Sequence, residues 1–308
     1  MSKHQPSGVA IIAASSLFFG VMAVTTRLLA GKVPAAEIAA VRFAIGIVAC
    51  AIWFIARRQK PNLGRWRLLA MRGTFGGIAV VTYFFAIQRL GAAAATVLNY
   101  SSPIYAAVFA AWFLGERSTW VKRLGLVFAT AGAVLVTLSS APEGQHWSAV
   151  DLGALAGVIS AIAGGAAMTS MRKLRDDTDA ASIFFAFCVV GFVLSAPLAA
   201  PQWVPLEGNT VWICLAVGVL SIIGQMLFTY GMGFTSATAG SATTQLVPVV
   251  AWVLSLGMLH EAVTMLGVLG ALLCVGGVLI GVVNANANAN ANARTTSQSP
   301  TLTPPENA

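Results

Sequence analysis

Charged residues are scarce in this chain, and their scarcity excludes most soluble folds. Only 9% of the 308 residues are Asp, Glu, Lys or Arg, whereas 57% are hydrophobic. A soluble domain normally has about 25% charged residues, which keep its surface in contact with water. A chain this apolar cannot maintain such a surface, so we expect an integral membrane protein.

Histidine is rare, and the common catalytic motifs are missing. The three histidines, His4, His146 and His260, lie at the ends of apolar stretches. Residues 260–264 begin like the zinc motif HExxH, but Thr264 stands where its second histidine would be. The sequence has neither a GxSxG motif nor a P-loop. We therefore expect no enzyme activity, catalytic residue, metal site or cofactor.

Cysteine and basic residues also fail to form functional patterns. The four cysteines lie inside or at the edge of apolar spans without CxxC spacing, which favours packing over a disulfide or a metal site. The net charge of +8 comes from basic residues in short loops. No basic stripe has interleaved aromatic residues, so we do not expect nucleic-acid binding.

The sequence does contain one module written twice. Residues 8–138 match residues 153–283 at a constant offset of 145. Each copy has five apolar spans, and an odd number requires the second copy to enter the membrane in the opposite orientation. Inverted repeats with a substrate path between them are typical of transporters. The matched pairs include Arg27 and Arg172, Gly46 and Gly191, Pro103 and Pro248, Glu116 and Glu261, Gly125 and Gly270, and Gly132 and Gly277.

The apolar runs predict an all-α membrane protein with ten transmembrane helices, arranged as two inverted five-helix repeats around a central cavity. The first repeat covers residues 1–140 and the second 148–283. Residues 284–308 form a tail of Asn-Ala and Ser/Thr/Pro-rich sequence, which we expect to be disordered and cytoplasmic. We place the spans at 8–29, 35–56, 68–88, 92–114, 120–138, 150–171, 180–199, 210–231, 237–258 and 263–283.

The distribution of basic residues predicts the orientation. Three, Arg27, Lys32 and Arg89, lie on one side, and Arg42 is embedded. Because cytoplasmic loops are enriched in Lys and Arg, the richer side is cytoplasmic and both termini lie inside. We expect a multi-pass protein of the bacterial inner (plasma) membrane. The fourteen basic residues on the richer side are Lys3, Arg57, Arg58, Lys60, Arg65, Arg67, Arg72, Arg117, Lys122, Arg123, Arg172, Lys173, Arg175 and Arg294.

Polar residues recur on one face of the fourth and ninth spans, at steps of three and four residues. Such faces are costly in hydrocarbon and should point inward. One interpretation is a pair of proline-bent helices lining a water-filled cavity, with Asn99 and Gln245 facing the water; the other is ordinary contact between helices. The first of these faces consists of Thr96, Asn99, Pro103, Ala106 and Ala110 with Tyr100 at its edge, and the second of Ser241, Thr244, Pro248, Ala251 and Ser255 with Gln245 at its edge.

Other spans add polar and aromatic side chains to the predicted cavity. Aromatic rings beside hydroxyl groups suit a substrate with a flat apolar part and a polar end. These candidates are Ser15, Ser16 and Phe19 in the first span, Tyr83 in the third, Ser160 in the sixth, and Gln225, Thr229 and Tyr230 in the eighth.

Two arginines lie within apolar spans. Arg42 lies about two turns inside the second span, where it could attract a substrate carboxylate, snorkel outward or bond backbone carbonyls. Arg72 lies near the start of the third span, from which an arginine can snorkel to the interface. No acidic residue lies near the middle of any span. A substrate with uncompensated positive charge is therefore disfavoured, and we expect a neutral or zwitterionic small molecule.

The sequence resembles the ten-helix EamA-type branch of the drug/metabolite transporter superfamily over residues 8–283. The resemblance lies in Ala40-Val41-Arg42-Phe43, Pro103, Phe113-Leu114-Gly115-Glu116 and Gly125 to Gly132, and in Pro248, Leu259-His260-Glu261 and Gly270 to Gly277. It implies two inverted halves, alternating access, and a cavity among the first, third, fourth, sixth, eighth and ninth helices. Within the family the chain looks most like bacterial exporters of aromatic amino acids. Four-helix relatives use an acidic residue in their first helix, which is absent here.

Three functions remain open from the sequence. The first is an exporter of amino acids, aromatic ones among them, or of similar small metabolites. The second is a multidrug exporter, and the third is a membrane protein that does not transport. The expected partners are a small substrate and membrane lipid, with the chain acting as a monomer or weak homodimer; the glycine stripes at 125–132 and 270–281 favour close helix packing over dimerisation.

Overall fold

The computed structural model describes residues 8–29, 31–90, 98–115, 119–139, 152–258 and 264–280, and within these ranges the chain is helical with short connections. The first half comprises α1 (Gly8–Arg27), α2 (Ala35–Ala56), α3 (Trp66–Leu90), α5 (Ser102–Phe113) and α6 (Trp120–Ser139). The second comprises α7 (Leu152–Leu174), α8 (Ala180–Ala199), η1 (Ala200–Gln202), α9 (Asn209–Gly231), η2 (Met232–Phe234), α10 (Ala237–Thr243), α11 (Leu246–Met258) and an apolar helix, Met265–Ile280.

The described helices overlap all the predicted spans. Among the described residues, seven segments are long and apolar enough to cross a membrane, and three further apolar helices are shorter. The beginning of the fourth predicted span, at 92–97, lies outside the described residues, as does the predicted tail 284–308. The seven are Gly8–Thr26, Ala35–Ala56, Trp66–Ala86, Leu152–Leu174, Ala180–Gln202, Asn209–Phe234 and Ala237–Leu254, and the three are Ser102–Phe113, Arg123–Leu135 and Met265–Ile280.

The equivalent helices α2 and α8 run in opposite directions through the bundle. At one end, Arg65 just before α3 forms an ion pair with Asp177 in the loop between α7 and α8, with Nη1 and Oδ2 2.9 Å apart. At the other end, the backbone N–H of Val204, which follows α8, donates to the Glu37 carboxylate at the start of α2, 2.9 Å away. α2 therefore begins where α8 finishes, and the two equivalent helices are antiparallel.

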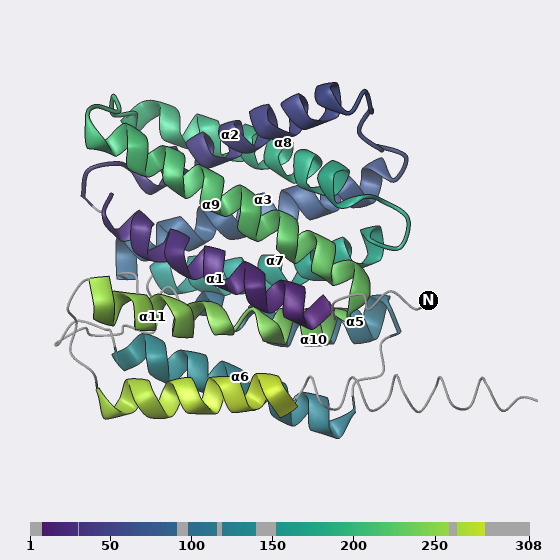
Figure 1. Ribbon diagram of the computed structural model, residues 1–308, viewed down its shortest axis with the longest axis vertical. Helices are drawn as coiled ribbons and strands as arrows, with labels where there is room; N and C mark the ends of the chain where they lie inside the picture. Colours follow the sequence, from purple (N-terminus) through teal and green to yellow (C-terminus); the bar gives the residue numbers. More distant parts are fainter. Residues whose placement is uncertain are drawn as a thin grey trace, which may run out of the picture.

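The two halves interlock rather than lying side by side. α2 and α8 lie at one edge of the bundle, α6 and Met265–Ile280 lie at the opposite edge, and α1, α3, α7 and α9 lie between (Figure 1). Contacts are reciprocal: α1 packs on α9, while its equivalent α7 packs on α3, the equivalent of α9. α5 packs on α7 in the same way that α11 packs on α1. Each half thus completes the packing of the other.

Glycines form the closest of these reciprocal contacts. A Cβ added at Gly132 would clash with the backbone of Cys274 and Gly270, and one added at Gly277 would clash with the backbone of Ala129 and Gly125. At the other edge, Gly46 lies against Cys188 and Gly191 lies against the ring of Phe43. Because the repeat offset relates the members of each pair, the same close approach is made twice at both edges.

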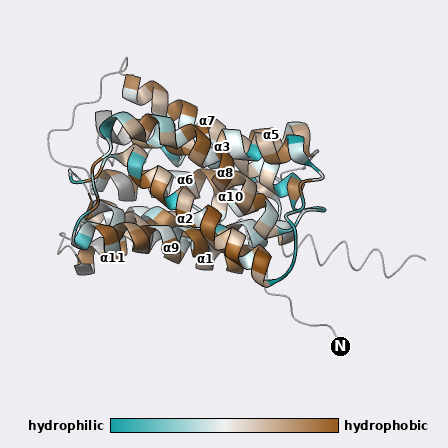
Figure 2. Ribbon diagram, turned by 90° about the horizontal axis from the view of Figure 1, so that it is seen from above, coloured by the Kyte–Doolittle hydropathy of each residue, from teal (hydrophilic) through white to brown (hydrophobic). Residues whose placement is uncertain are grey.

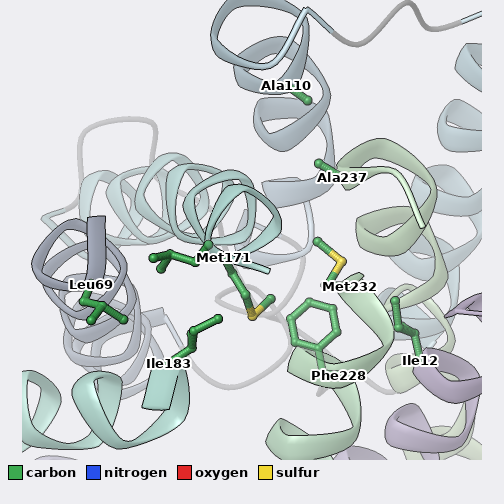
Figure 3. Close-up of a cluster of buried hydrophobic side chains, with 9 residues drawn as sticks. Ile12, Leu69, Ala110, Met171, Ile183, Phe228, Met232 and Ala237 are labelled. Carbon is green, nitrogen blue, oxygen red and sulfur yellow. The ribbon is translucent and has the colours of Figure 1, made fainter. Parts of the chain in front are cut away.

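Apolar side chains fill the interior and also cover the outside. In the cluster of Figure 3, Ile12, Met171 and Ile183, each fully buried, come from three different helices of the two halves. Side chains such as Ile55, 76% exposed, and Leu272, 67% exposed, point outward. Hydrophilic residues gather mainly in the connections at the two ends of the bundle (Figure 2). This pattern suits a bundle surrounded by lipid.

Candidate functional site

The fourth and ninth spans each contain a turn, and the two turns overlap at the 145-residue offset, where Tyr100 matches Gln245. A turn at Tyr100 and Ser101 precedes α5, and a turn at Thr244 and Gln245 separates α10 from α11. Backbone hydrogen bonds between residues three apart replace the four-residue bonds of an α-helix here. The Gln245 N–H, for example, donates to the Ala242 carbonyl, 3.1 Å away. Irregular backbone at membrane depth is tolerated only inside protein or beside a water-filled space. We call these two turns the paired breaks. Their irregular backbone makes them the first place to look for a substrate site.

The prolines have a different role from the predicted one. Pro103 lies in the first turn of α5, and Pro248 is the third residue of α11. In the first turn of a helix a backbone N–H has no intrahelical partner, so proline fits without loss. The prediction that each proline bends a continuous helix is therefore wrong: each helix is broken just before its proline, and both prolines are buried.

Gln245 joins the two breaks directly. Its side-chain Nε2 donates to the Tyr100 carbonyl, 2.8 Å away, and to the Thr130 hydroxyl, 2.9 Å away. The backbone carbonyl of Gln245 accepts a hydrogen bond from the Cys274 thiol, 3.1 Å away. The side chain is 0% exposed, so the prediction that Gln245 faces water is wrong for this conformation. Its amide oxygen has no partner among the described residues.

Asn99 lies just before the first break and contacts the sixth predicted span. The Ser160 hydroxyl of α7 is 2.8 Å from Asn99 Oδ1 and 2.8 Å from the Ala79 carbonyl of α3. A hydroxyl has one proton and therefore donates to one of these oxygens at a time. Asn99 itself is half-buried, whereas Ser160 is fully buried. Three helices thus meet at one polar point beside the break.

The remaining predicted hydroxyl groups mostly bond within their own helices. Ser15 and Ser16 both donate to the Ile12 carbonyl, at 2.7 and 3.1 Å. Thr244 donates to the Ser241 carbonyl at 2.6 Å, and Gln225 Nε2 lies 3.5 Å from the Thr229 hydroxyl. All five of these side chains are buried, while Thr96 lies outside the described residues. The structure brings Asn99, Tyr100, Ser160 and Gln245 to the breaks but leaves Ser15 and Ser16 facing their own helix.

The predicted aromatic residues separate into two places. Tyr83 stacks at an angle on Phe84 in α3, with ring centroids 5.8 Å apart. Phe19 of α1 packs against Gly224 of α9. Tyr230, in contrast, lies at the end of α9 and is 47% exposed, with Phe234 at 5.0 Å. Tyr230 is therefore largely exposed, unlike the neighbouring candidate Thr229, which is buried.

A basic residue from another part of the chain lies against the end of α9. The guanidinium of Arg175, in the loop after α7, lies 5.7 Å from the Tyr230 ring. Partial burial lowers the pKa of Arg175 from its ordinary value. An arginine on an aromatic face at the end of a helix is a common arrangement at the membrane interface.

Sequence reasoning missed one polar cluster. Arg72 was expected to snorkel toward the start of α3, but it is only 5% exposed and reaches the other way, along the helix to Gly76. Its guanidinium lies 4.1 Å from the ring of Phe187 in α8. Arg42 lies 5.1 Å from the ring of Phe43 in α2. The signal that could have found it is Gly76, one turn after Arg72, because only glycine leaves room there.

Metal binding finds no support in the described side chains. Within those ranges no group of three or more His, Cys, Asp or Glu side chains could hold a metal ion. The four cysteines are free and buried. The groups at the breaks are therefore amide, hydroxyl, aromatic and thiol groups, which can bind a small molecule.

Known proteins with similar sequences are membrane transporters. A pseudopaline exporter of Pseudomonas aeruginosa is 30% identical over 240 residues, which cover 77% of this chain and 82% of the exporter. An uncharacterised transporter of Helicobacter pylori is 28% identical, covering 76% of this chain and 79% of that protein. The human solute carrier family 35 member G1 is 24% identical, covering 56% and 50% respectively.

The fold is also found in a solved structure. A protein crystal structure superposes with a TM-score of 0.77 at 21% sequence identity, covering 92% of this chain and all of that chain. The model of the EamA-like transporter family matches the sequence twice, at residues 6–138 and 151–283. Together these two matches span most of the chain, and the chain therefore belongs to the EamA-like transporter family.

Proposed function

We propose that this chain exports small carboxylate-bearing metabolites, amino acids among them, across a bacterial inner membrane by alternating access. Ten transmembrane helices in two inverted repeats rock against each other around the paired breaks. The observation that carries the proposal is the contact between Gln245 Nε2 and the Tyr100 carbonyl, which joins an interrupted helix of each half. Discontinuous helices at the interface of inverted repeats form the substrate site in several transporter folds.

The relatives and the charge pattern support an exporter of polar metabolites. The Pseudomonas aeruginosa relative is an exporter by name. In the described part of the chain, no acidic side chain lies deep within a membrane-crossing helix, and the deeply placed charges, Arg42 and Arg72, are positive. A cationic drug would meet repulsion there, whereas a carboxylate would meet attraction.

Transport by purified protein in liposomes tests this proposal. We expect saturable flux of labelled tryptophan that unlabelled phenylalanine competes and that empty liposomes lack. Flux measured with and without a pH gradient shows whether protons are coupled to export. Saturable flux of a quaternary dication that amino acids leave unchanged would refute the amino acid proposal and identify a multidrug exporter.

The orientation needs a separate test. We propose that both termini are cytoplasmic, which places Asn62 on the inside and Gln202 on the outside. Both residues are exposed, and the native cysteines are buried, so single cysteines can be introduced after replacing the native ones. An impermeant thiol reagent on intact cells should label Gln202→Cys and not Asn62→Cys. The reverse labelling would overturn the orientation while leaving the fold unaffected.

A further inference from the structure

Arg42 faces the interior of the bundle. One turn further along α2, Ile45 contacts Gly218 of α9, and Gly46 contacts Cys188 of α8. Residues one helical turn apart share a face, so Arg42 points into the space between α8 and α9. Its side chain keeps part of its surface accessible. The lipid-facing side of α2 is elsewhere, at residues such as Ile55, which is 76% exposed.

Arg72 reaches the same region from α3. Its guanidinium lies over Phe187, and Phe187 packs edge-to-face on Phe43 with ring centroids 5.1 Å apart. Arg42 lies beside the other ring of this pair, Phe43. The two guanidiniums therefore flank one pair of aromatic rings.

In the part of the chain that the structure describes, neither arginine has a counter-charge. The ion pairs within the described ranges are those of Arg65 with Asp177 and of Arg172 and Lys173 with Asp176, all at the end of the bundle. Arg72 Nε is buried and has no hydrogen-bond partner in those ranges. Contact with an aromatic face offsets only part of the hydration free energy that a cation loses when it is buried. Two unpaired guanidiniums at this depth are costly for a purely structural purpose.

The geometry points to an anion-binding subsite formed by Arg42 and Arg72, which takes the carboxylates of the transported substrate. Guanidinium groups present paired N–H donors that match a carboxylate. Two cations without a counter-charge favour a substrate with two carboxylates and a net negative charge over the same molecule with one carboxylate amidated. This inference rests on the proposed export function and ranks, among its carboxylate-bearing substrates, those with a second carboxylate above those with one.

Binding to the purified protein in neutral detergent tests the subsite without requiring transport. The probes are glutarate and its monoamide glutaramate, which have nearly the same size and differ by one negative charge. We expect glutarate to raise the unfolding temperature in a saturable manner, and glutaramate to need at least a tenfold higher concentration for the same rise. Equal effects of the two probes, or no effect of either up to their solubility limit, would overturn the inference.

Variants locate the effect at the two arginines. Arg42→Gln and Arg72→Gln should each weaken the response to glutarate at least tenfold. Gly76→Ala should do the same while keeping both charges, because the added Cβ occupies the place of the Arg72 guanidinium. Arg67→Gln is the matched control, since Arg67 is exposed at the start of α3. An undiminished response in Arg72→Gln and Gly76→Ala would place the anion elsewhere and refute the assignment.

A lipid phosphate has chemistry similar to a carboxylate, so a second measurement separates the sources. Phosphatidylglycerol added to the micelles should leave the glutarate response intact. Stabilisation by phosphatidylglycerol alone, sensitive to Arg72→Gln, would make the pair a lipid site and refute the substrate assignment. Failure of amino acid flux in liposomes, together with a positive glutarate response, would remove the proposed substrates but leave the subsite.

Discussion

The two halves share their packing but differ in charge. At the α2–α8 edge, Gly46 and its equivalent Gly191 make the same close approach. At neighbouring positions the halves diverge: Arg42 corresponds to Phe187, and Arg72 corresponds to Val217 at the 145-residue offset. Because the second half is built with apolar residues at both positions, the fold itself does not need arginine there. The difference separates what the scaffold requires from what the site requires.

The largest effect should come from the ring that belongs to the scaffold. Phe187 is 3% exposed and packs on Phe43 and Phe184, so Phe187→Ala should lower the free energy of unfolding by about 3–5 kcal/mol. Arg72→Met keeps an unbranched side chain of similar length and removes an unpaired charge, so it should cost less than about 1 kcal/mol. Detergent-micelle unfolding curves compare the two. A cost for Arg72→Met as large as that for Phe187→Ala would make Arg72 a structural residue.

The next effect concerns the opposite edge, where the halves are most alike. Gly132→Val and Gly277→Val should each destabilise the protein by about 1–3 kcal/mol, because the added atoms meet the backbone of the facing helix. Gly276→Ala lies in the same helix as Gly277 and meets no atom within 4 Å, which makes it the control. Unfolding curves that show Gly276→Ala to be as harmful as Gly277→Val would remove the close contact as the cause.

A smaller effect should separate two equivalent serines. Ser160 bonds across helices to Asn99 and Ala79, whereas Ser15 bonds only to its own helix. Ser160→Ala should therefore cost about 0.5–1.5 kcal/mol, the usual net value of a buried hydrogen bond. Ser15→Ala should stay within about 0.5 kcal/mol, since back-bonding within a helix stabilises little. If the two substitutions lower the free energy of unfolding equally, the hydrogen bonds of Ser160 across helices do not stabilise the fold more than the local bond of Ser15.

The smallest effect concerns the ion pairs of Asp176, in the loop between α7 and α8. Partial burial disfavours the charge of Asp176, but hydrogen bonds and attraction from Arg172 and Lys173 outweigh it and lower its pKa. A lowered pKa means that the stabilisation is present above the ordinary aspartate pKa and is lost as the pH falls through the lowered value. The unfolding temperatures of wild type and Asp176→Asn should differ slightly at neutral pH and converge in strong acid. A difference that grows on acidification would show that the sign is wrong.

Much of the fold follows from the sequence because helices in lipid must be apolar and of a certain length. The apolar runs place α2 and α8 to the residue, at 35–56 and 180–199. The breaks were not predicted. Three- and four-residue spacing assumes a continuous helix, and the face containing Pro103 or Pro248 fits a bent helix as well as a broken one. Only tertiary contacts, such as those of Gln245, show where the chain leaves the helical path.

The site was less predictable for a related reason. The repeat identified Tyr100 and Gln245 as equivalent positions, but periodicity within one helix cannot show that equivalent residues of two halves touch. Snorkelling predicts Arg72 to point toward the nearer end of its helix, as most arginines do. Its actual direction depends on Gly76 and on Phe187, which belongs to the other half. Such contacts between helices cannot be deduced from the periodicity of a single helix.

The reciprocal glycine contacts have a consequence for the origin of the chain. Gly132 meets Cys274 and Gly270, while Gly277 meets Ala129 and Gly125, their equivalents. Two identical modules facing each other about a two-fold axis would form this isologous interface without any change. A single-module ancestor could therefore have assembled as an antiparallel homodimer through the same surface. Once fused, each copy became free to diverge where contact did not constrain it, which is how one half alone could acquire Arg42 and Arg72.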